Sequence, residues 1–332
     1  MYAEIERAKN RIPLFAIGKK NGKIVAIGIF SIRPLLFANM CSAEAICLRG
    51  PAFDDIGYGR EYLLQVIKYF KYLYVGSLRI SPSWYFPEAE SVESLLKEIN
   101  FNSYDQSTRS ATGIIDLQRS KEEIYSSFHQ KHRQKINLAK RMGIRICPAT
   151  SFEEASIAFR CLKTMRSERG IIPMSSEEFN ATYQYILKDQ ELGIILNAYA
   201  DSTFLGTIWG FFGPQIMNPS GYAVDAEACK KVSSALTIGP DLFLQMCIIA
   251  KDRGCIGFDT EGPAVDPKDP IQHFKMRFNP TKVEKISQHI YTCNNVIKSL
   301  EKVNTKIGKI ERIIESLPYR LKKELSTYKA KV

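Results

Sequence analysis

The sequence predicts an α/β protein built from two halves with a similar order of elements. Short apolar runs bounded by turn residues, typical of buried strands, alternate with longer segments of helical periodicity. The same order begins again after Gly143, although no residue-level repeat accompanies it. With 332 residues, 45% of them hydrophobic, the chain is long enough for two cores of ordinary size.

The first half begins with a predicted hairpin, because Asn21-Gly22 between two apolar runs supplies the positive backbone angles of a tight turn. Gly50-Pro51 breaks a later strand, and Asp54-Asp55 is placed to cap the following helix. The predicted strands are 14–19, 24–32, 45–48, 78–82 and 112–117, and the predicted helices are 62–73 and 91–99.

Two helices, 120–129 and 132–142, follow, and Gly143 is expected to end the second as a left-handed cap. The second half predicts strands at 144–147, 194–200, 204–212, 221–224 and 255–258, with helices at 151–169, 175–188 and 240–253. Helical periodicity returns from about Thr292, with a break at Leu317-Pro318. We therefore expect domains at 1–142 and 143–290 and a basic helical tail at 291–332.

Composition excludes several classes of protein. No stretch approaches the roughly 18 uncharged apolar residues of a spanning helix, and the acidic N-terminus is unlike a signal peptide, so we expect a cytoplasmic protein. The eight cysteines contain no C-x-x-C pair and lie mostly in apolar runs, which predicts free thiols. The four histidines lack metal-ligand spacing, so we expect no metal site.

The formal net charge of +11 indicates an anionic partner, such as nucleic acid, a phosphorylated substrate or an acidic membrane surface. Residues 291–332 carry ten Lys or Arg and four Glu, a local charge of 10 − 4 = +6. A second basic cluster lies between Ser120 and Arg145. An alternative interpretation is that these charge runs are solvated helix faces.

The stretch from Cys255 to Phe278 is the predicted active centre. An apolar strand ends at Phe258, and Asp259, Glu261 and Gly262 follow where a strand leads into a functional loop. Lys275 then lies between two aromatic residues, Phe274 and Phe278. The competing interpretation is structural, because a lysine flanked by aromatics at helical spacing commonly covers an apolar face with its aliphatic stem.

Four segments together resemble the Fem family of aminoacyl-tRNA-dependent peptidyltransferases. Their order and separations match that family from about Pro13 to Phe278, whereas the basic tail is outside the resemblance. The segments are Arg49-Gly50-Pro51-Ala52-Phe53-Asp54; Ile115-Asp116-Leu117 with Arg133-x-x-Ile136-x-x-Ala139-x-x-x-Gly143-Ile144; Thr164-Met165-x-x-Glu168-Arg169-Gly170-Ile171 with Phe179; and Gly254, Phe258-Asp259, Gly262, Phe274-Lys275 and Phe278.

The resemblance implies two tandem acetyltransferase-like (GNAT) domains and an amide-forming reaction without a cofactor. In this family, aminoacyl-tRNA is the co-substrate, and an amine of a cell-wall peptide precursor attacks its ester. The tetrahedral oxyanion of that attack can be stabilised by a fixed cation. The family's Phe-Lys pair corresponds to Phe274 and Lys275, so Lys275 is the predicted catalytic residue. Arg277 is expected either to assist or bind RNA, or to form an exposed ion pair.

Further residues are predicted around this pair. Asp259 or Glu261 could accept the proton that the attacking amine must lose, or could only cap the loop. Tyr222 corresponds to a ligand-contacting tyrosine of the family, with a core tyrosine as the alternative. The resemblance also implies substrate binding by Arg169 and Lys9. Some members hold a nucleotide-sugar precursor with Arg and Tyr where this chain has Met174 and Glu178. We therefore expect no cation there and an acceptor that differs from the usual muramyl peptide.

Two other functions are compatible with the same fold. An acyl-CoA-dependent N-acyltransferase would bind the coenzyme's pyrophosphate at a Gly-rich turn before a helix, but the segment 230–240 lacks the Arg-x-x-Gly-x-Gly pattern. A non-catalytic binder of RNA, or of an anionic membrane at the periphery of the bilayer, would also account for the charge. Retention of Phe274-Lys275 and Asp259 favours an enzyme.

Overall fold

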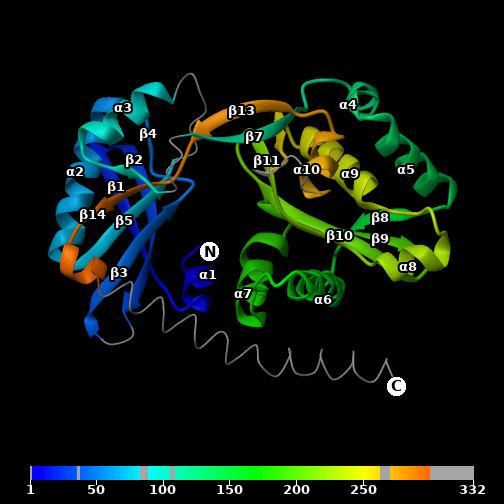
Figure 1. Ribbon diagram of the computed structural model, residues 1–332, viewed down its shortest axis with the longest axis horizontal. Helices are drawn as coiled ribbons and strands as arrows, with labels where there is room; N and C mark the ends of the chain where they lie inside the picture. Colours follow the sequence, from blue (N-terminus) through cyan, green and yellow to red (C-terminus); the bar gives the residue numbers. More distant parts are fainter. Residues whose placement is uncertain (1, 36–37, 83–88, 105–108, 262–269, 300–332) are drawn as a thin grey trace. The chain divides into compact units, whose positions relative to one another are not determined.

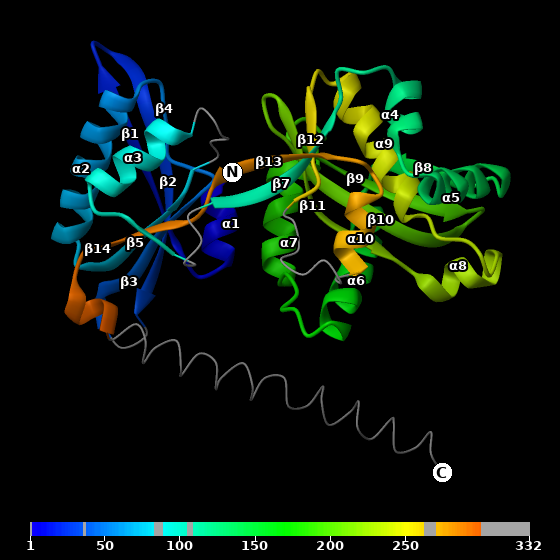
Figure 2. The same ribbon diagram turned by 45° about the horizontal axis from the view of Figure 1, so that its top comes forward.

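The computed structural model confirms the α/β class, with two mixed sheets and helices packed on them (Figure 1 and Figure 2). The chain divides into two compact units. Unit 1 comprises Met1–Lys9 and Arg109–Lys285, and unit 2 comprises Asn10–Thr108 and Ile286–Val332. The structure describes residues 2–35, 38–82, 89–104, 109–261 and 270–299.

In its described residues, unit 2 contains a seven-stranded sheet in the order β1-β2-β3-β5-β14-β6, with β4 paired to β2. The side chain of Asp55 accepts a hydrogen bond from the Gly57 N–H and caps α2, as expected. The helices α2 and α3 share one apolar cluster with the sheet, in which Phe30 and Phe70 meet edge to face. The elements are β1 (Ile12–Lys20), β2 (Lys23–Leu35), β3 (Ala38–Leu48), β4 (Ala52–Phe53), α2 (Ile56–Tyr72), β5 (Val75–Ser81), α3 (Glu90–Glu98), β6 (Asn102–Ser103) and β14 (His289–Thr292).

Unit 1 contains, within its described residues, a second seven-stranded sheet in the order β13-β7-β12-β11-β10-β9-β8. Its elements are α1 (Tyr2–Ala8), β7 (Arg109–Asp116), α4 (Lys121–Ser127), α5 (Gln130–Arg141), β8 (Arg145–Pro148), α6 (Phe152–Glu168), α7 (Ser176–Thr182), the π-helical turn η1 (Tyr183–Leu187), β9 (Gly193–Ala200), β10 (Thr203–Phe212), β11 (Ile216–Val224), α8 (Ala226–Val232), α9 (Gly239–Asp252), β12 (Gly257–Asp259), α10 (Pro270–Met276) and β13 (Thr281–Ile286).

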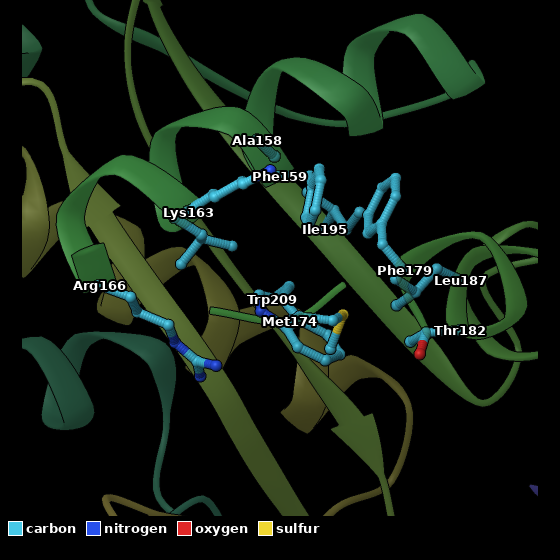
Figure 3. Close-up of a pocket in the computed structure, with 11 residues that line it drawn as sticks. Ala158, Phe159, Lys163, Arg166, Met174, Phe179, Thr182, Leu187, Ile195 and Trp209 are labelled. Atoms are coloured by element: carbon cyan, nitrogen blue, oxygen red, sulfur yellow. The ribbon is translucent and has the colours of Figure 1, made fainter. Parts of the chain in front are cut away.

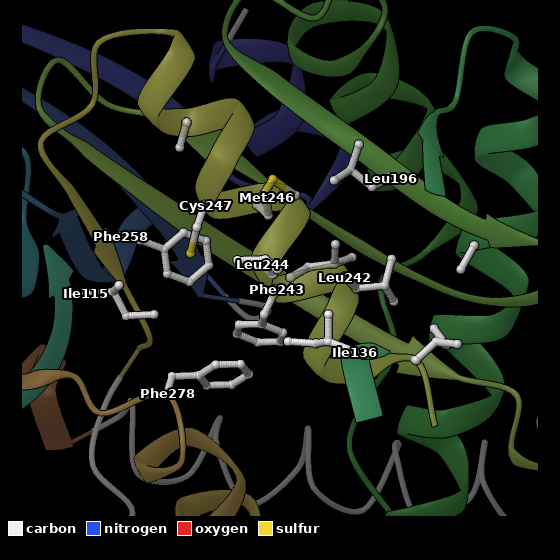
Figure 4. Packing of buried hydrophobic residues seen from close by; sticks show 14 of the residues in the cluster. Ile115, Ile136, Leu196, Leu242, Phe243, Leu244, Met246, Cys247, Phe258 and Phe278 are labelled. Atoms are coloured by element: carbon white, nitrogen blue, oxygen red, sulfur yellow. The ribbon is translucent and has the colours of Figure 1, made fainter. Parts of the chain in front are cut away.

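The two faces of the unit 1 sheet carry separate cores. Alternation along β9 sends Leu196 into a cluster with α4, α5 and α9, and sends Ile195 into a cluster with α6, α7 and η1. Figure 4 shows the first cluster, in which Phe243 stacks on Phe278 and meets Phe258 edge to face. This helix-covered face leads directly to the residues of the predicted active centre.

Each sheet is completed by a strand from the other half of the chain. β7 follows the unit 2 strand β6 in sequence but pairs with β12 in unit 1. β14 follows the unit 1 strand β13 but pairs with β5 and β6 in unit 2. The units therefore differ from the expected ranges 1–142, 143–290 and 291–332. Local periodicity identified β7 as a strand, but only long-range pairing decides which sheet takes it.

Several local predictions hold and several elements were missed. Gly143 ends α5 with a positive φ of 68°, as expected. The predicted helix 175–188 is divided into α7 and the turn η1. Tyr291 and Thr292, expected in the helical tail, are in β14 because they pair with β5. The predicted helices from 300 onward and the break at Leu317-Pro318 lie outside the described residues. Missed elements include α1, α8, α10, β13 and β14.

The two units differ at their parallel strand pairs. In unit 2, β3 and β5 stay paired from Ser42–Val75 to Leu48–Ser81. In unit 1, β11 and β12 pair only at Ile216–Gly257 and Met217–Phe258, although β11 continues to Val224. The unit 1 pair is therefore open beyond Met217, on the side where β12 ends.

Candidate functional site

Tyr222 and Phe274 occupy the open end of the β11–β12 pair. Tyr222 lies on β11, beyond the residues that pair with β12, and is itself paired with Ile208 on β10. Its ring stacks on that of Phe274, with centroids 5.2 Å apart and planes at 15°. Phe274 also meets Phe243 and Phe278 in T-shaped contacts at 5.4 and 5.1 Å. The helical spacing of Phe274 and Phe278 thus turns both rings inward and fixes α10 against the sheet.

Gly239 gives the Phe274 ring room at the start of α9. It is the first residue of α9, and a Cβ added there would lie 3.3 Å from Cζ of Phe274. The absence of a side chain lets the ring approach the start of α9. The Phe274 ring therefore lies against the first residue of α9.

Lys275 follows Phe274 and is half-buried. Its Nζ donates a hydrogen bond to the backbone carbonyl of Glu261, two residues beyond the end of β12. Glu261 has a left-handed backbone, with φ 52°. The structure therefore brings Lys275 and the strand-end loop together, through the main chain of Glu261. The catalytic role of Lys275 and its structural alternative both stay predictions.

Asp259 is the last residue of β12 and is buried. Its Oδ1 accepts a hydrogen bond from the Thr112 hydroxyl and a second from the Glu261 N–H, at 2.7 Å for the latter. These bonds fasten the loop after β12 to β7 and fix the carbonyl that holds Lys275. Asp259 is thus joined to the predicted catalytic residue through the backbone of Glu261.

His132, which sequence analysis did not select, holds the other side of the segment. Its Nε2 lies 2.9 Å from the Phe274 carbonyl oxygen, and because that oxygen only accepts, Nε2 carries the hydrogen. The imidazole packs on Phe274 and Phe278, with centroids 5.1 and 4.5 Å away. Burial is the main cause that lowers the pKa of His132 to about 4, so the ring is neutral near pH 7.

A backbone bond reinforces the same junction. The His129 N–H donates to the Arg277 carbonyl at 2.7 Å, so the start of α5 meets the chain just after α10. The available sequence signal was the spacing of His132, Ile136 and Ala139, which places the histidine on the buried face of α5. That spacing shows burial of the ring but says nothing of its partner.

The predicted arginines occupy different places. Arg277 is half-buried, and its positive charge contributes to the lowered pKa of His132. Arg169 is the exposed C-cap residue of α6. Burial raises the pKa of Tyr222, and the charge of Arg169 acts in the opposite direction. Electrostatics therefore links one predicted arginine to the Phe274 junction and the other to Tyr222.

Lys9 is held at α7. Its Nζ lies 3.3 Å from Glu6 and 3.2 Å from Glu178, which joins the N-terminal helix α1 to α7. The expectation that no cation lies near Met174 and Glu178 is therefore wrong, because Lys9 comes from a distant part of the sequence. Its carboxylate partners also explain how a positive charge is accommodated there.

A narrow apolar cavity lies between α6, α7 and the sheet (Figure 3). Its volume of about 20 Å³ is close to that of one water molecule. Phe159, Phe179, Met174 and Trp209 form its apolar wall, and Arg166 lies at one end. This cavity is too small for an amino acid or a peptide, so it is not the substrate site in this conformation.

Within the described residues, no group of three His, Cys, Asp or Glu side chains is placed to hold a metal ion. No helix in the described ranges is long and apolar enough to cross a membrane. The chemistry that these residues offer is that of an ammonium group beside an aromatic cluster, with carboxylates and guanidinium groups around it.

Comparison of the whole chain with known proteins shows its fold. No family model and no curated protein sequence matches it. A crystal structure of FemX superposes with a TM-score of 0.76 at 12% identity, covering 90% of this chain and 92% of that chain. The chain therefore has the fold of FemX, two tandem GNAT-like domains, as the sequence resemblance implied.

Two further structures are similar over most of their length. The C-terminal DUF2156 domain of a proposed lysylphosphatidylglycerol synthetase from Agrobacterium fabrum gives a TM-score of 0.53 at 10% identity, covering 91% of this chain and 89% of that chain. A conserved protein of unknown function from Bacteroides thetaiotaomicron gives 0.52 at 10% identity, covering 87% and 89%. At these identities the likeness concerns the fold.

Proposed function

We propose that this protein is an aminoacyltransferase that moves an amino acid from aminoacyl-tRNA to an amine of a cell-wall peptide precursor or a related acceptor. The observation that carries the proposal is the placement of Phe274-Lys275. Stacking on Tyr222 fixes Phe274 at the open end of the β11–β12 pair, and Lys275 reaches the loop where β12 ends. FemX, which shares the fold, supports the same class of activity.

The proposed reaction is aminolysis of an ester. The acceptor nitrogen attacks the ester carbonyl carbon, which forms the C–N bond and a tetrahedral oxyanion. The ammonium group of Lys275 stabilises that oxyanion. When the intermediate collapses, the C–O bond to the tRNA ribose breaks, the ribose oxygen takes a proton, and the amine nitrogen loses one. Amide, free tRNA and an unchanged protein remain.

The resting position of Lys275 suits this role. Its described hydrogen bond is to a neutral carbonyl, so this contact orients the ammonium without neutralising its charge. Asp259 accepts from Thr112 and from the Glu261 N–H, and thereby keeps that carbonyl in place. We assign Asp259 a catalytic part as proton acceptor and anchor of the loop, and we assign Glu261 to the edge of the substrate site.

The start of α9 favours tRNA over acyl-CoA as the donor. In a CoA enzyme this helix N-terminus would receive the pyrophosphate. Here the Phe274 ring packs against Gly239, and Asp241, buried in the first turn, adds a carboxyl group. Burial raises the pKa of Asp241, which shows that this position disfavours charge. Arg277 and Arg169 are the proposed contacts for RNA phosphate or ribose.

The acceptor class is the least constrained part of the proposal. Lys9 beside Glu178 supplies a cation where an acceptor phosphate could bind, and Tyr222 offers a ring and a hydroxyl. The fold is shared both with FemX and with a proposed lysylphosphatidylglycerol synthetase domain, so amines and lipid hydroxyls are both acceptors to assay. We favour the amine, because the Phe-Lys pair carries the Fem resemblance.

Donor binding is the first test. Purified protein is titrated with an aminoacyl-tRNA mixture and with acetyl-CoA while the salt concentration is varied. We expect selective binding of particular charged tRNAs that weakens with salt. Saturable binding of acetyl-CoA with only diffuse RNA affinity would establish the acyl-CoA alternative instead.

Lys275→Ala tests catalysis itself. Loss of one oxyanion-stabilising group reduces kcat by about 10²–10³-fold. In Lys275→Ala we expect that fall in the rate of single-turnover transfer, with tRNA affinity unchanged. The matched control is Lys282→Ala, because Lys282 is an exposed lysine on β13. Unchanged turnover in Lys275→Ala would remove this residue from the mechanism. Tight tRNA binding without transfer in the parent protein would favour the non-catalytic RNA binder.

A further inference from the structure

The β1–β2 hairpin of unit 2 presents a row of half-exposed apolar side chains on one face, which ends where Ser31 on the same face is buried. Phe15 and Ile17 on β1 are 51% and 49% exposed, and Ile27 opposite Ile17 on β2 is 39% exposed. Directly paired residues lie on the same side of a sheet, so these side chains form one face. The opposite face of the hairpin carries Leu14 and Phe30, which pack in the unit 2 core.

The apolar face continues beyond these three residues. Ile24 near the hairpin turn is 54% exposed, and Leu48 on the neighbouring strand β3 is 51% exposed. The pairing of Ile46 with Ser31 places Leu48 on the same side as Ile27. On the other side of edge strand β1, a groove of about 570 Å³ runs along α2 and is lined by Tyr58, Tyr62 and Tyr69.

Positive charge is concentrated at the turn end of this apolar surface, whereas Glu61 lines the groove along α2. The turn between β1 and β2 carries Lys19, Lys20 and Lys23, all exposed. The sequence from Ile12 to Leu35 contains no acidic residue. Lys20 lies over the ring of Tyr58, with Nζ 4.6 Å from the centroid, so one lysine is already held at the mouth of the groove.

We propose that the β1–β2 hairpin docks this protein on an anionic lipid bilayer. The exposed apolar side chains would enter the headgroup–acyl boundary, and the lysines would contact lipid phosphates. Tyrosine rings are suited to the same depth, because one end is apolar and the other polar. Binding at this surface is peripheral, and it would bring the unit close to lipid-linked acceptors.

Other occupants fit the hairpin less well. Edge-strand lysines also discourage pairing between copies, but that role gives no reason for a row of exposed Ile and Phe on the sheet face. RNA binding would use stacking platforms with polar neighbours, whereas this face is mostly aliphatic. A second copy would bring the two Lys19–Lys23 turns into the same interface only at an electrostatic cost.

The test is sedimentation of the full chain with phosphatidylcholine vesicles that contain or lack phosphatidylglycerol. Phe15→Thr/Ile17→Thr removes apolar contact but places residues with high strand propensity at both positions, with Val296→Thr as control because Val296 is 72% exposed. Lys19→Gln/Lys23→Gln removes charge, with Lys230→Gln/Lys231→Gln on α8 as control. Thermal unfolding verifies that each variant is folded.

We expect binding only to the anionic vesicles, reduced about 10-fold or more by each hairpin variant and unchanged by each control. Absence of vesicle binding by the parent protein overturns the proposal. Equal binding by the parent and the hairpin variants also overturns it, because another basic part of the chain would then be responsible. Two outcomes with unchanged vesicle binding would assign the surface to another partner. If the parent is a dimer that dissociates in Phe15→Thr/Ile17→Thr, the partner is a second copy of this chain. If the lysine variant loses affinity for tRNA, the partner is RNA.

Discussion

The parallel strand pairs β3–β5 and β11–β12 occupy corresponding positions in two sheets that have a similar order of strands. In unit 2 the two strands stay hydrogen-bonded along their length, whereas in unit 1 they separate after two residue pairs. Beyond the paired residues, Tyr222 on β11 stacks on Phe274, which precedes Lys275. Within the described residues, the two similar scaffolds therefore differ in where their parallel strands stop pairing, and the candidate site lies in unit 1.

The buried carboxylates of the two sheets also have different kinds of partner. In unit 2, the buried carboxylate of Glu44 on β3 pairs with Arg79, with an N–O separation of 2.9 Å. In unit 1, the buried carboxylate of Asp259 on β12 instead receives a hydroxyl and a backbone N–H at the start of a loop. The first arrangement joins neighbouring strands, whereas the second positions a loop beside the proposed catalytic lysine.

The largest expected effect comes from the aromatic cluster. Phe243→Ala should lower the free energy of unfolding by about 3–5 kcal/mol, because Phe243 is buried against Tyr222, Phe274 and Phe278. Phe70→Ala in unit 2 should be similarly destabilising. Under conditions where both variants are folded by circular dichroism, only Phe243→Ala should abolish aminoacyl transfer. Equal activity in the two variants would contradict the assignment of the site to unit 1.

The next effect depends on pH and on His132. Its pKa is lowered from 6.5 to about 4 by burial, so as pH falls below 6.5 the unfolded state takes up a proton before the folded state does. Stability should therefore decrease by about 3 kcal/mol between pH 6.5 and 4. Urea unfolding of the parent and of His132→Gln measures this. A pH dependence that is the same in both proteins would assign it to other groups.

Asp259→Asn sharpens the comparison of the two buried carboxylates. We expect a loss of about 1–3 kcal/mol, because the bonds from Thr112 and from the Glu261 N–H weaken. Glu44→Gln should also destabilise through Arg79, without changing kcat. A fall in kcat in Asp259→Asn that Thr112→Val does not reproduce would identify Asp259 as the proton acceptor. Equal falls in both would make it a positioning residue.

The smallest expected effect concerns the start of α9. Gly239→Ala should reduce stability by about 1 kcal/mol, since the added Cβ would lie 3.3 Å from the Phe274 ring and displace it slightly. The free energy lost from transition-state stabilisation should exceed the free energy of unfolding that is lost. The reason is that a displaced Phe274 also moves Lys275, the next residue. Gly59→Ala in unit 2, where a Cβ would lie 2.8 Å from Phe53, should lose more stability and no activity. Full activity in Gly239→Ala would show that the ring position is unimportant.

Much of the candidate site was present in the sequence as separate residues. Sequence analysis placed Phe274 and Phe278 at helical spacing around Lys275, and the apolar run to Phe258 predicted the strand that became β12. The Fem resemblance added Lys275 and Tyr222, and the structure stacks Tyr222 on the neighbouring Phe274. His132 escaped notice because its partner is a backbone carbonyl 142 residues away. Lys9 was expected near a phosphate but its pairing with Glu178 on α7 required the fold.

Local sequence patterns predicted the α/β class, most helices and strands, the hairpin at Asn21-Gly22 and the left-handed end of α5 at Gly143. These features depend on periodicity and on the backbone preferences of single residues, which act over a few positions. Tertiary structure alone decided that β7 completes the sheet of unit 1 and β14 that of unit 2. It also decided that β11 and β12 pair at only two positions within the described residues. Strand partners are chosen by pairing between distant segments, and no local pattern encodes that choice.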